Sequence, residues 1–203
     1  MDTNIKPEDD FEKNGYVVIR NVLDPELLKY VATQIKMIEK LLCLQNNVKP
    51  TDYAFSDPDI KTAFTYYSAL TTETLLETMN EQMEKIVNKS LFPSYSYLRI
   101  YYKDSTLAKH TDRPSCEYSA TICITIDTEP WDIWFETKEG IEKQIFLQPG
   151  DMIVYKGTEL VHWRNKYEHN EQIQVFLHYV NAYGPYEEYK YDKRLMLATC
   201  KNL

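Results

Sequence analysis

The sequence predicts an α+β protein whose mainly β core follows a helical first half. Two observations support this prediction. Before Pro93, apolar residues recur every three or four positions, which is the spacing of an amphipathic helix. After Pro93, short alternating segments are separated by turn signals, which is typical of a β-sandwich or barrel. The second half shows no alternation of strands with helices, so a doubly wound parallel sheet is excluded.

Length and composition predict one domain, residues 1–203, with a substantial core. The chain has 203 residues, of which 43% are hydrophobic. Its net charge of −8 argues against generic nucleic-acid binding, which needs clustered Lys and Arg. No apolar run approaches the roughly 18 residues of a membrane span, and the polar N-terminus lacks the apolar segment of a signal peptide. We therefore expect a cytoplasmic protein with reduced cysteines and no membrane partner.

Residues 1–93 are expected to supply an N-terminal strand and the supporting helices. Residues 11–19 are predicted to form a short strand after a turn, in which Gly15 supplies permissive backbone. Asp24 as N-cap and Pro25 as first helical residue predict a helix over residues 25–43. The remaining segments are predicted as a loop over residues 45–58, a weak helix over 59–70 and a clear helix over 72–88.

Residues 94–180 are expected to form the β core, with the helices packed on one outer face of a sheet. The first strand of the core is rich in tyrosine, and its alternation places Tyr97, Arg99 and Tyr101 on one face. Residues 181–203 are expected to form a C-terminal tail. The core strands are predicted over residues 94–102, 117–126, 132–135, 143–147, 152–155, 160–164 and 172–180.

A candidate metal site lies after the first core strand. His110 and Asp112 are two residues apart, so on extended backbone their side chains share one face. His162, which follows a Pro-Gly-Asp turn and an apolar strand, is the best candidate for a third ligand. Two histidines and one carboxylate on one side of a metal form a facial triad. This geometry leaves coordination positions open and suits non-haem Fe(II) oxygenases.

The residues around these ligands carry a wider resemblance. The sequence resembles the Fe(II)- and 2-oxoglutarate-dependent dioxygenases over most of its length. Residues 11–28 are similar to the opening of phytanoyl-CoA-hydroxylase-like members, and the run from Tyr101 through Leu107 to His110 and Asp112 is similar to prolyl-hydroxylase-like members. Within this superfamily, the chain looks closest to a group of small microbial and viral proteins. The matching signatures are residues 110–117, 162–164 and 174–180.

The resemblance implies a double-stranded β-helix, or jelly roll, and an oxygenase activity. It implies Fe(II) as the metal, 2-oxoglutarate and O2 as co-substrates, and hydroxylation of a substrate with release of succinate and CO2. The substrate is a small molecule or a protein side chain; fold-level likeness does not identify it, nor the oligomeric state. Two alternatives stay open: a cupin-like metal-binding protein without oxygenase activity, and an Fe(II) enzyme that does not use 2-oxoglutarate.

The sequence departs from the superfamily at the usual cation for the far carboxylate of 2-oxoglutarate. Members carry this basic residue on the last core strand, where the present chain has Gln172 and no Lys or Arg from Glu168 to Val180. A buried carboxylate needs a cation or several strong donors. We expect Arg164, two residues after His162, to take this role, because its planar fork suits bidentate carboxylate binding. Arg99 and Arg113 remain alternatives, and the resemblance implies a donating Tyr101 hydroxyl.

Three further residues are candidates for the substrate pocket. His178 lies on the last core strand and is either a cavity residue or a satisfied core histidine. Trp131 and Trp134 lie between the metal strand and the distal histidine, where they either form a wall of the pocket or pack under a loop. Trp163, next to His162, is expected to point to the opposite face of its strand.

Overall fold

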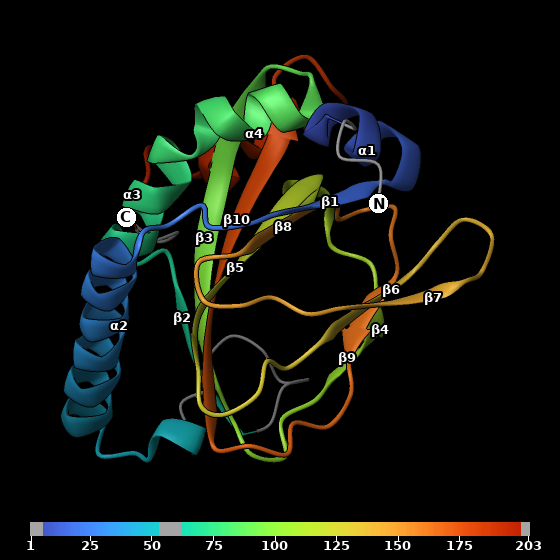
Figure 1. Cartoon of the computed structure of the whole chain (residues 1–203). Coiled ribbons are helices and arrows are strands. Elements are labelled where there is room, and N and C mark those ends of the chain that lie inside the picture. The colour runs from blue at the N-terminus through green and yellow to red at the C-terminus, as the bar shows by residue number, and fades with distance from the viewer. Residues whose placement is uncertain (1–5, 53–61, 200–203) are drawn as a thin grey trace.

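The computed structural model describes residues 6–52 and 62–199, which form two antiparallel β-sheets with helices on one side (Figure 1). The large sheet has the strand order β1-β8-β5-β10-β3-β2, and the small sheet has the order β4-β9-β6-β7. The strands are β1 (Tyr16–Ile19), β2 (Ala63–Tyr67), β3 (Leu91–Tyr102), β4 (Leu107–His110), β5 (Tyr118–Ile126), β6 (Ile133–Glu136), β7 (Glu142–Ile145), β8 (Met152–Lys156), β9 (His162–Arg164) and β10 (Glu171–Asn181).

The helices cover the outer face of the large sheet, as predicted. Val31 and Ile35 of α2 pack in one core with Leu98 of β3 and Ile122 of β5. Figure 1 shows α2 and the small sheet on opposite sides of the molecule. The α-helices are α1 (Pro7–Asn14), α2 (Pro25–Asn46), α3 (Leu70–Thr78) and α4 (Asn80–Val87), and the 3₁₀ helices are η1 (Pro50–Asp52), η2 (Pro114–Cys116) and η3 (Glu187–Lys193). Within the described ranges, no helix is long and apolar enough to cross a membrane.

The start of α2 is the predicted one. The side chain of Asp24 accepts hydrogen bonds from the backbone N–H groups of Glu26 and Leu27 at 3.0 and 2.9 Å, which satisfies two donors that the first turn leaves open. The helix continues three residues beyond the predicted residue 43 and ends before Asn47, which adopts a left-handed conformation. The predicted helix over residues 72–88 is divided at Met79 into α3 and α4.

Two predictions in the first half are wrong. Residues 11–14 belong to α1 rather than to a strand, because Pro7 and three acidic residues in the first turn favour a helix that Gly15 ends at φ 76°. The predicted helix over 59–70 contains strand β2, which pairs with β3 along its whole length. Its aromatic and β-branched residues suit a sheet edge. Residues 53–61, which include the start of that predicted helix and part of the predicted loop, lie outside the described residues.

The predicted strands of the second half are all present, with ends that differ by a few residues. β4, which carries His110, forms a strand separate from β3. Between the sheets lies an apolar core that includes Cys123 of β5, Ile153 of β8 and Phe135 of β6. The inner face of the large sheet therefore packs against the small sheet and forms one wall of the cavity described below.

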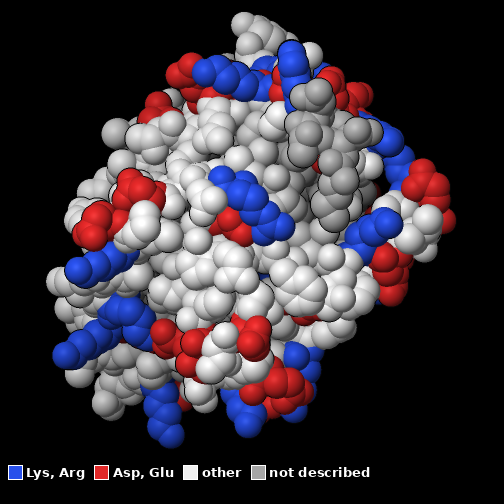
Figure 2. All heavy atoms as spheres, in the orientation of Figure 1, with Lys and Arg blue, Asp and Glu red and all other residues white. Residues whose placement is uncertain are grey.

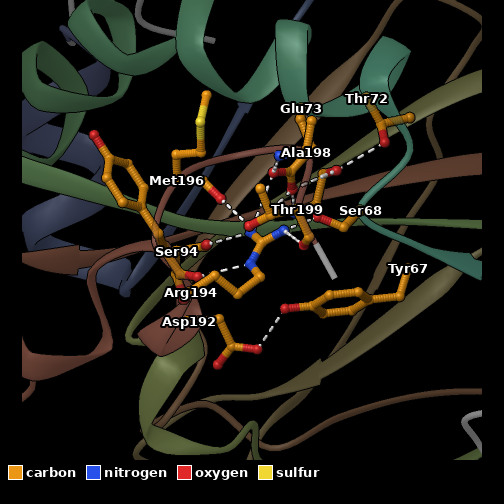
Figure 3. A network of polar contacts seen from close by, with 12 residues as sticks. Tyr67, Ser68, Thr72, Glu73, Ser94, Asp192, Arg194, Met196, Ala198 and Thr199 are labelled. Carbon is orange, nitrogen blue, oxygen red and sulfur yellow. Dashed lines mark hydrogen bonds and ion pairs between the residues drawn. The ribbon is translucent and has the colours of Figure 1, made fainter. Parts of the chain in front are cut away.

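The C-terminal segment is fixed to the helical layer by a buried polar network (Figure 3). Arg194, whose side chain is fully buried, forms an ion pair with Glu73 of α3 at 3.1 Å and also donates to the carbonyl of Ser94. Glu73 accepts further hydrogen bonds from the backbone N–H groups of Ser96 and Ala198. Residues 181–199 are thus held against the domain rather than forming a free tail. On the part of the face in Figure 2 that the structure describes, basic and acidic residues are interspersed.

Candidate metal centre and its cavity

Strand pairing brings the three predicted ligands together. β4 and β9 are neighbours in the small sheet, and His110 lies directly opposite His162, with ring centroids 4.3 Å apart. Asp112 follows β4 by two residues, and its Oδ1 lies 3.6 Å from Nε2 of His110 and 3.7 Å from Nε2 of His162. One ligand atom from each residue lies within 4.8 Å of the other two. Two imidazoles and a carboxylate therefore converge on one point, as a facial triad requires.

The Asp112 carboxylate is held by its neighbours. The backbone N–H of Asp112 donates to the carbonyl of Gly157 at 2.8 Å, and the Ser119 hydroxyl donates to Oδ2 of the Asp112 carboxylate at 3.0 Å. Gly157 lies so close that a Cβ there would be 2.5 Å from Asp112 Oδ2 and 2.2 Å from the carbonyl oxygen of Cys116. The turn between β8 and β9 therefore needs a residue without a side chain.

Backbone carbonyls orient both histidines. Nδ1 of His110 lies 2.9 Å from the carbonyl oxygen of Ala108, and Nδ1 of His162 lies 3.0 Å from that of Leu160. A carbonyl oxygen only accepts, so Nδ1 carries the proton in each ring. Nε2 is then left with its lone pair directed toward Asp112 and the cavity. Such a fixed tautomer is the arrangement by which proteins prepare histidine for a metal.

Burial and mutual contacts shift the pKa of all three groups. The Asp112 contact raises the pKa of His110, whereas burial lowers the pKa of His162. Burial opposes ionisation of Asp112, but its contacts with His110, His162 and other neighbours outweigh this effect and hold its pKa below the ordinary range. At neutral pH the site therefore presents an ionised carboxylate beside a neutral His162.

A cavity of about 560 Å³ opens next to these ligands. Its remaining polar lining includes Arg99, Arg113, Arg164 and His178. Its walls are largely aromatic, and the aromatic lining residues are Tyr67, Tyr95, Tyr97, Tyr155 and Phe176. The combination of an apolar wall with a few convergent polar groups is typical of a small-molecule site.

Arg164 is a buried cation that lacks a carboxylate partner among the described residues. It is 2% exposed and lies on β9 two residues after His162. Its Nη1 donates to the carbonyl oxygens of Trp131 and Asp132 at 2.7 and 3.1 Å, whereas Nε and Nη2 have no hydrogen-bond partner in the described structure. Burial accordingly lowers its pKa. A buried guanidinium with two open donors is poised for an anionic ligand.

The other two arginines are engaged differently. Arg113 forms a bidentate pair with Asp192 at 3.1 and 3.0 Å, and its guanidinium lies 4.6 Å from the ring centroid of Tyr95. Arg99 extends from β3, where its Nη1 donates to the hydroxyl of Tyr101 at 3.1 Å. Tyr101 itself is fully buried. The guanidinium of Arg113 is thus already paired with a carboxylate. Arg99 and Tyr101 are hydrogen-bonded to each other on the inner face of the large sheet.

The three predicted pocket residues lie in different places relative to the cavity. His178 lines the cavity, where its Nδ1 lies 2.9 Å from the Ser119 hydroxyl and burial lowers its pKa to about 4. Trp131 lies behind the cavity, with its ring against Arg164 and Tyr101. Trp134 is not among the residues that line this cavity, so of the two alternatives left open for it the pocket wall is not the one found. Strand alternation places it on the outer face of the small sheet, stacked on Trp163, while Ile133 lines the cavity instead.

A second group of possible ligands shares Asp112 with the first. Asp112, Cys116 and His178 also place ligand atoms within 4.8 Å of one another. Burial raises the pKa of Cys116 to about 12, so its thiol stays protonated at neutral pH. Because a metal binds the thiolate and not the thiol, this group is the weaker ligand set.

Two features of the candidate site are not predicted from the sequence: a glycine beside a ligand and part of the aromatic wall. Gly157 is not among the predicted site residues, although a glycine between two core strands of a chain with only 5 glycines is a signal for close backbone approach. The aromatic wall formed by Tyr67 and Phe176 is also missed. Tyr67 belongs to a segment whose pattern predicts a helix, and its side chain reaches the cavity only because β2 pairs with β3.

No protein-family model matches the sequence, and no curated protein resembles it significantly. Among solved structures, HygX from Streptomyces hygroscopicus with nickel and 2-oxoglutarate bound superposes with a TM-score of 0.65 at 12% identity, over 85% of each chain. A 2OG-Fe(II) oxygenase family protein from Burkholderia pseudomallei gives 0.64 at 13% identity, over 85% of this chain and 87% of the other.

SnoN, a non-haem α-ketoglutarate-dependent epimerase from nogalamycin biosynthesis, gives a TM-score of 0.65 at 13% identity over 85% of this chain and 80% of its own. At such identities a likeness bears on the fold and not on the reaction. Each superposition covers most of the chain, whose core is made of the two sheets. The chain therefore has the fold of the 2OG-Fe(II) oxygenases.

Proposed function

We propose that this chain is an Fe(II)- and 2-oxoglutarate-dependent oxygenase that hydroxylates a substrate held in the cavity and releases succinate and CO2. Its two sheets then correspond to the double-stranded β-helix of this class. The observation that carries the proposal is the position of Arg164. A buried cation with open donors lies two residues beyond His162, on the strand that completes a two-histidine, one-carboxylate group. One cavity would thus hold both the metal and the anionic co-substrate.

The donor set fits Fe(II). Imidazole nitrogens and one carboxylate, grouped on one side, leave positions free for other ligands. His110 and His162 would bind through Nε2, since Nδ1 of each faces a backbone carbonyl. Asp112 would bind through Oδ1, because the Ser119 hydroxyl holds Oδ2. Ser119 and Gly157 thereby fix the carboxylate before any metal arrives.

The surroundings of Arg164 fit the far carboxylate of 2-oxoglutarate. The open Nε and Nη2 donors offer a bidentate contact, and the ring of Trp131 packs against the guanidinium. Tyr101 makes a T-shaped ring contact with Trp131 and would supply a hydroxyl from the large sheet. When bound together, Fe(II), 2-oxoglutarate and O2 supply the oxidising chemistry. The protein binds and orients these groups and excludes water from the buried end of the cavity.

The cavity also favours a class of prime substrate. Tyr67, Tyr95, Tyr97 and Phe176 present aromatic surface to whatever occupies the cavity. Such walls suit a small molecule or a side chain with an apolar or planar portion. His178 contacts Ser119 at the boundary between this wall and the metal ligands. We expect its side chain to contact substrate rather than metal.

The test is consumption of the co-substrate. The purified chain, supplied with Fe(II), ascorbate and 2-oxoglutarate, is expected to form succinate and CO2 slowly, and faster with a hydroxylatable substrate. His110→Ala and Asp112→Ala should abolish this turnover and bind less metal. Trp134→Phe, on the outer face, is the matched control and should retain it. Succinate formation that is unchanged in both ligand variants would contradict the assignment.

One observation favours a second candidate, a cupin-like metal-binding protein without oxygenase activity. Gln172 occupies the usual position of the carboxylate-binding cation, and its side chain accepts a hydrogen bond from the N–H of Trp131. Calorimetric titration with 2-oxoglutarate, with Mn(II) as a redox-inert metal, separates the candidates. Metal binding without 2-oxoglutarate binding supports the second. Iron-dependent O2 consumption without 2-oxoglutarate binding identifies instead an Fe(II) enzyme that does not use this co-substrate.

A further inference from the structure

Helix α2 has a second apolar face that the rest of the chain leaves largely exposed. Its buried face, which includes Val31 and Ile35, packs on the large sheet. On the far side of the helix, five large apolar side chains remain exposed, from 36% for Leu27 to 72% for Leu44. We call this exposed face the α2 seam, and its apolar members are Leu27, Tyr30, Met37, Leu41 and Leu44. A contiguous apolar face of this kind usually marks an interaction site.

The α2 seam has the spacing of a coiled-coil interface. With Gln34 included, its members are separated by three, four, three, four and three residues, which is the alternation of a and d positions in a heptad repeat. The seam from Leu27 to Leu44 is about 26 Å long at roughly 1.5 Å per residue. Ridges with this spacing fit between those of another helix in a near-parallel or antiparallel crossing. The spacing therefore indicates a helix as the occupant.

Charges beside the seam select the direction and register of that helix. Glu26 and Lys40 both lie at exposed g positions, 14 residues apart (40 − 26). If a second copy of α2 packs antiparallel with a two-fold axis near Thr33, Glu26 of each copy approaches Lys40 of the other, and the axis makes this contact twice. In a parallel pair, g positions lie beside e positions, which include the apolar Val31 and Ile38, so neither charge gains an opposite partner. The helix dipoles also favour the antiparallel arrangement.

The surface next to the seam can receive side chains from a partner helix. A groove of about 290 Å³ lies between α2 and the start of α3, and Leu41, Tyr66 and Leu70 contribute to its lining. Leu70 is 71% exposed and extends the apolar surface beyond α2. Gln34, the polar member of the seam, donates to the Tyr30 hydroxyl and accepts from Thr71. These polar contacts within the chain let Gln34 enter an interface without a partner from the other copy.

We propose that the chain forms a two-fold symmetric homodimer through antiparallel packing of two α2 seams. Helix α2 lies on the helical side of the large sheet, away from the small sheet (Figure 1). The cavity is lined instead by residues of the large and small sheets that face each other. The dimer therefore leaves both cavities open. Dimerisation is independent of the proposed oxygenase activity, so the two proposals fail separately.

Sedimentation velocity over about 1–100 µM full-length chain tests the dimer. The wild-type chain is expected to shift from monomer to dimer within this range. Tyr30→Glu and Met37→Glu place charges in the seam, close to the proposed axis, and should raise the dimer dissociation constant at least tenfold. Ile141→Glu changes an apolar residue of similar exposure on the β6–β7 hairpin and should leave the dimer dissociation constant unchanged. A wild-type chain that stays monomeric, or a dimer that persists in both seam variants, overturns the proposal.

A charge exchange tests the antiparallel direction. Glu26→Lys alone should weaken the dimer several-fold, because it places a second positive charge opposite Lys40 in both contacts. The double variant with Glu26→Lys and Lys40→Glu restores opposite charges and should recover the affinity of the wild type. Circular dichroism of each variant checks that α2 remains helical. If the double variant dimerises as weakly as Glu26→Lys, the antiparallel arrangement is wrong.

Discussion

Gly157 lies so close to Asp112 that a Cβ atom on the glycine would be 2.5 Å from Oδ2 of the carboxylate. The same atom would be 2.2 Å from the carbonyl oxygen of Cys116 and 2.8 Å from the hydroxyl of Ser119. Two of these three neighbours hold or form the proposed metal ligand, and the third is backbone. The backbone carbonyl of Cys116 cannot swing aside, and any movement of the two side chains would displace the ligand or its hydrogen-bond donor, so the proposed metal site depends on a glycine at this turn.

Gly157→Ala is accordingly expected to displace Asp112 and weaken metal binding at least about tenfold, the size of effect seen when residues that orient metal ligands are changed. Metal content after dialysis and calorimetric Mn(II) titration measure this. Gly140→Ala is the control: its Cβ would meet no atom within 4 Å, and the backbone strain at its φ of +75° is confined to the turn between β6 and β7. That variant should bind metal normally. Equal metal affinity in both variants would show that the close approach has no role in the site.

The buried Arg194–Glu73 pair gives a stability prediction. The two side chains are 0% and 1% exposed and lie 3.1 Å apart. Glu73→Gln removes one charge and leaves Arg194 buried without its counter-ion, which costs about 3–5 kcal/mol of unfolding free energy. Urea denaturation followed by circular dichroism measures the loss. The matched control is Glu81→Gln in the exposed pair with Lys85, where no measurable change is expected.

The core strands and the proposed ligands could be predicted from the sequence because both depend on local patterns. Alternation after Pro93 marks strands, and the two-residue spacing of His110 and Asp112 marks a shared side of the backbone. By contrast, the local pattern around β2 predicts a helix. Its aromatic residues acquire their strand conformation from pairing with β3, which lies more than 20 residues later in the chain. Such tertiary pairing overrides local preference.

The same limit applies to the carboxylate-binding cation. Sequence spacing places Arg164, Arg99 and Arg113 near the site but does not rank them by their partners. The decisive contact of Arg113 is with Asp192, 79 residues away. Trp134 shows a related limit. Alternation along β6 places Trp134 and Ile133 on opposite faces of the strand, but the sequence does not show which of the two faces points inward.

Arg113 is predicted to have a structural role. Arg113→Lys keeps the charge but loses the bidentate fork on Asp192, so the unfolding free energy should fall by about 1 kcal/mol, the typical net value of a hydrogen bond. The affinity for 2-oxoglutarate should stay within about twofold of wild type. Thermal denaturation and calorimetric titration measure the two quantities. A large loss of 2-oxoglutarate affinity with unchanged stability would move the anion-binding role to Arg113.

Arg164 is predicted to hold the far carboxylate of 2-oxoglutarate. Its Nη1 is anchored on the carbonyl oxygens of Trp131 and Asp132, which leaves Nε and Nη2 open for two parallel hydrogen bonds. A charge-assisted contact of this kind contributes about 1.5–3 kcal/mol, roughly tenfold to a hundredfold in affinity. Arg164→Lys retains the charge but not the fork, so it should lose much of this affinity while Mn(II) binding survives.

Titration of 2-oxoglutarate into Mn(II)-loaded Arg164→Lys, Arg164→Ala and Arg99→Ala decides between Arg164 and Arg99, the two cavity arginines that are not paired with Asp192. Arg164→Ala also removes packing against Trp131, so its thermal stability is measured in parallel. Arg99→Ala should weaken binding less, because Arg99 would act through the Tyr101 hydroxyl that it contacts. If the Arg99 variant alone loses affinity, the carboxylate is held from the large sheet, and the open donors of Arg164 serve another ligand.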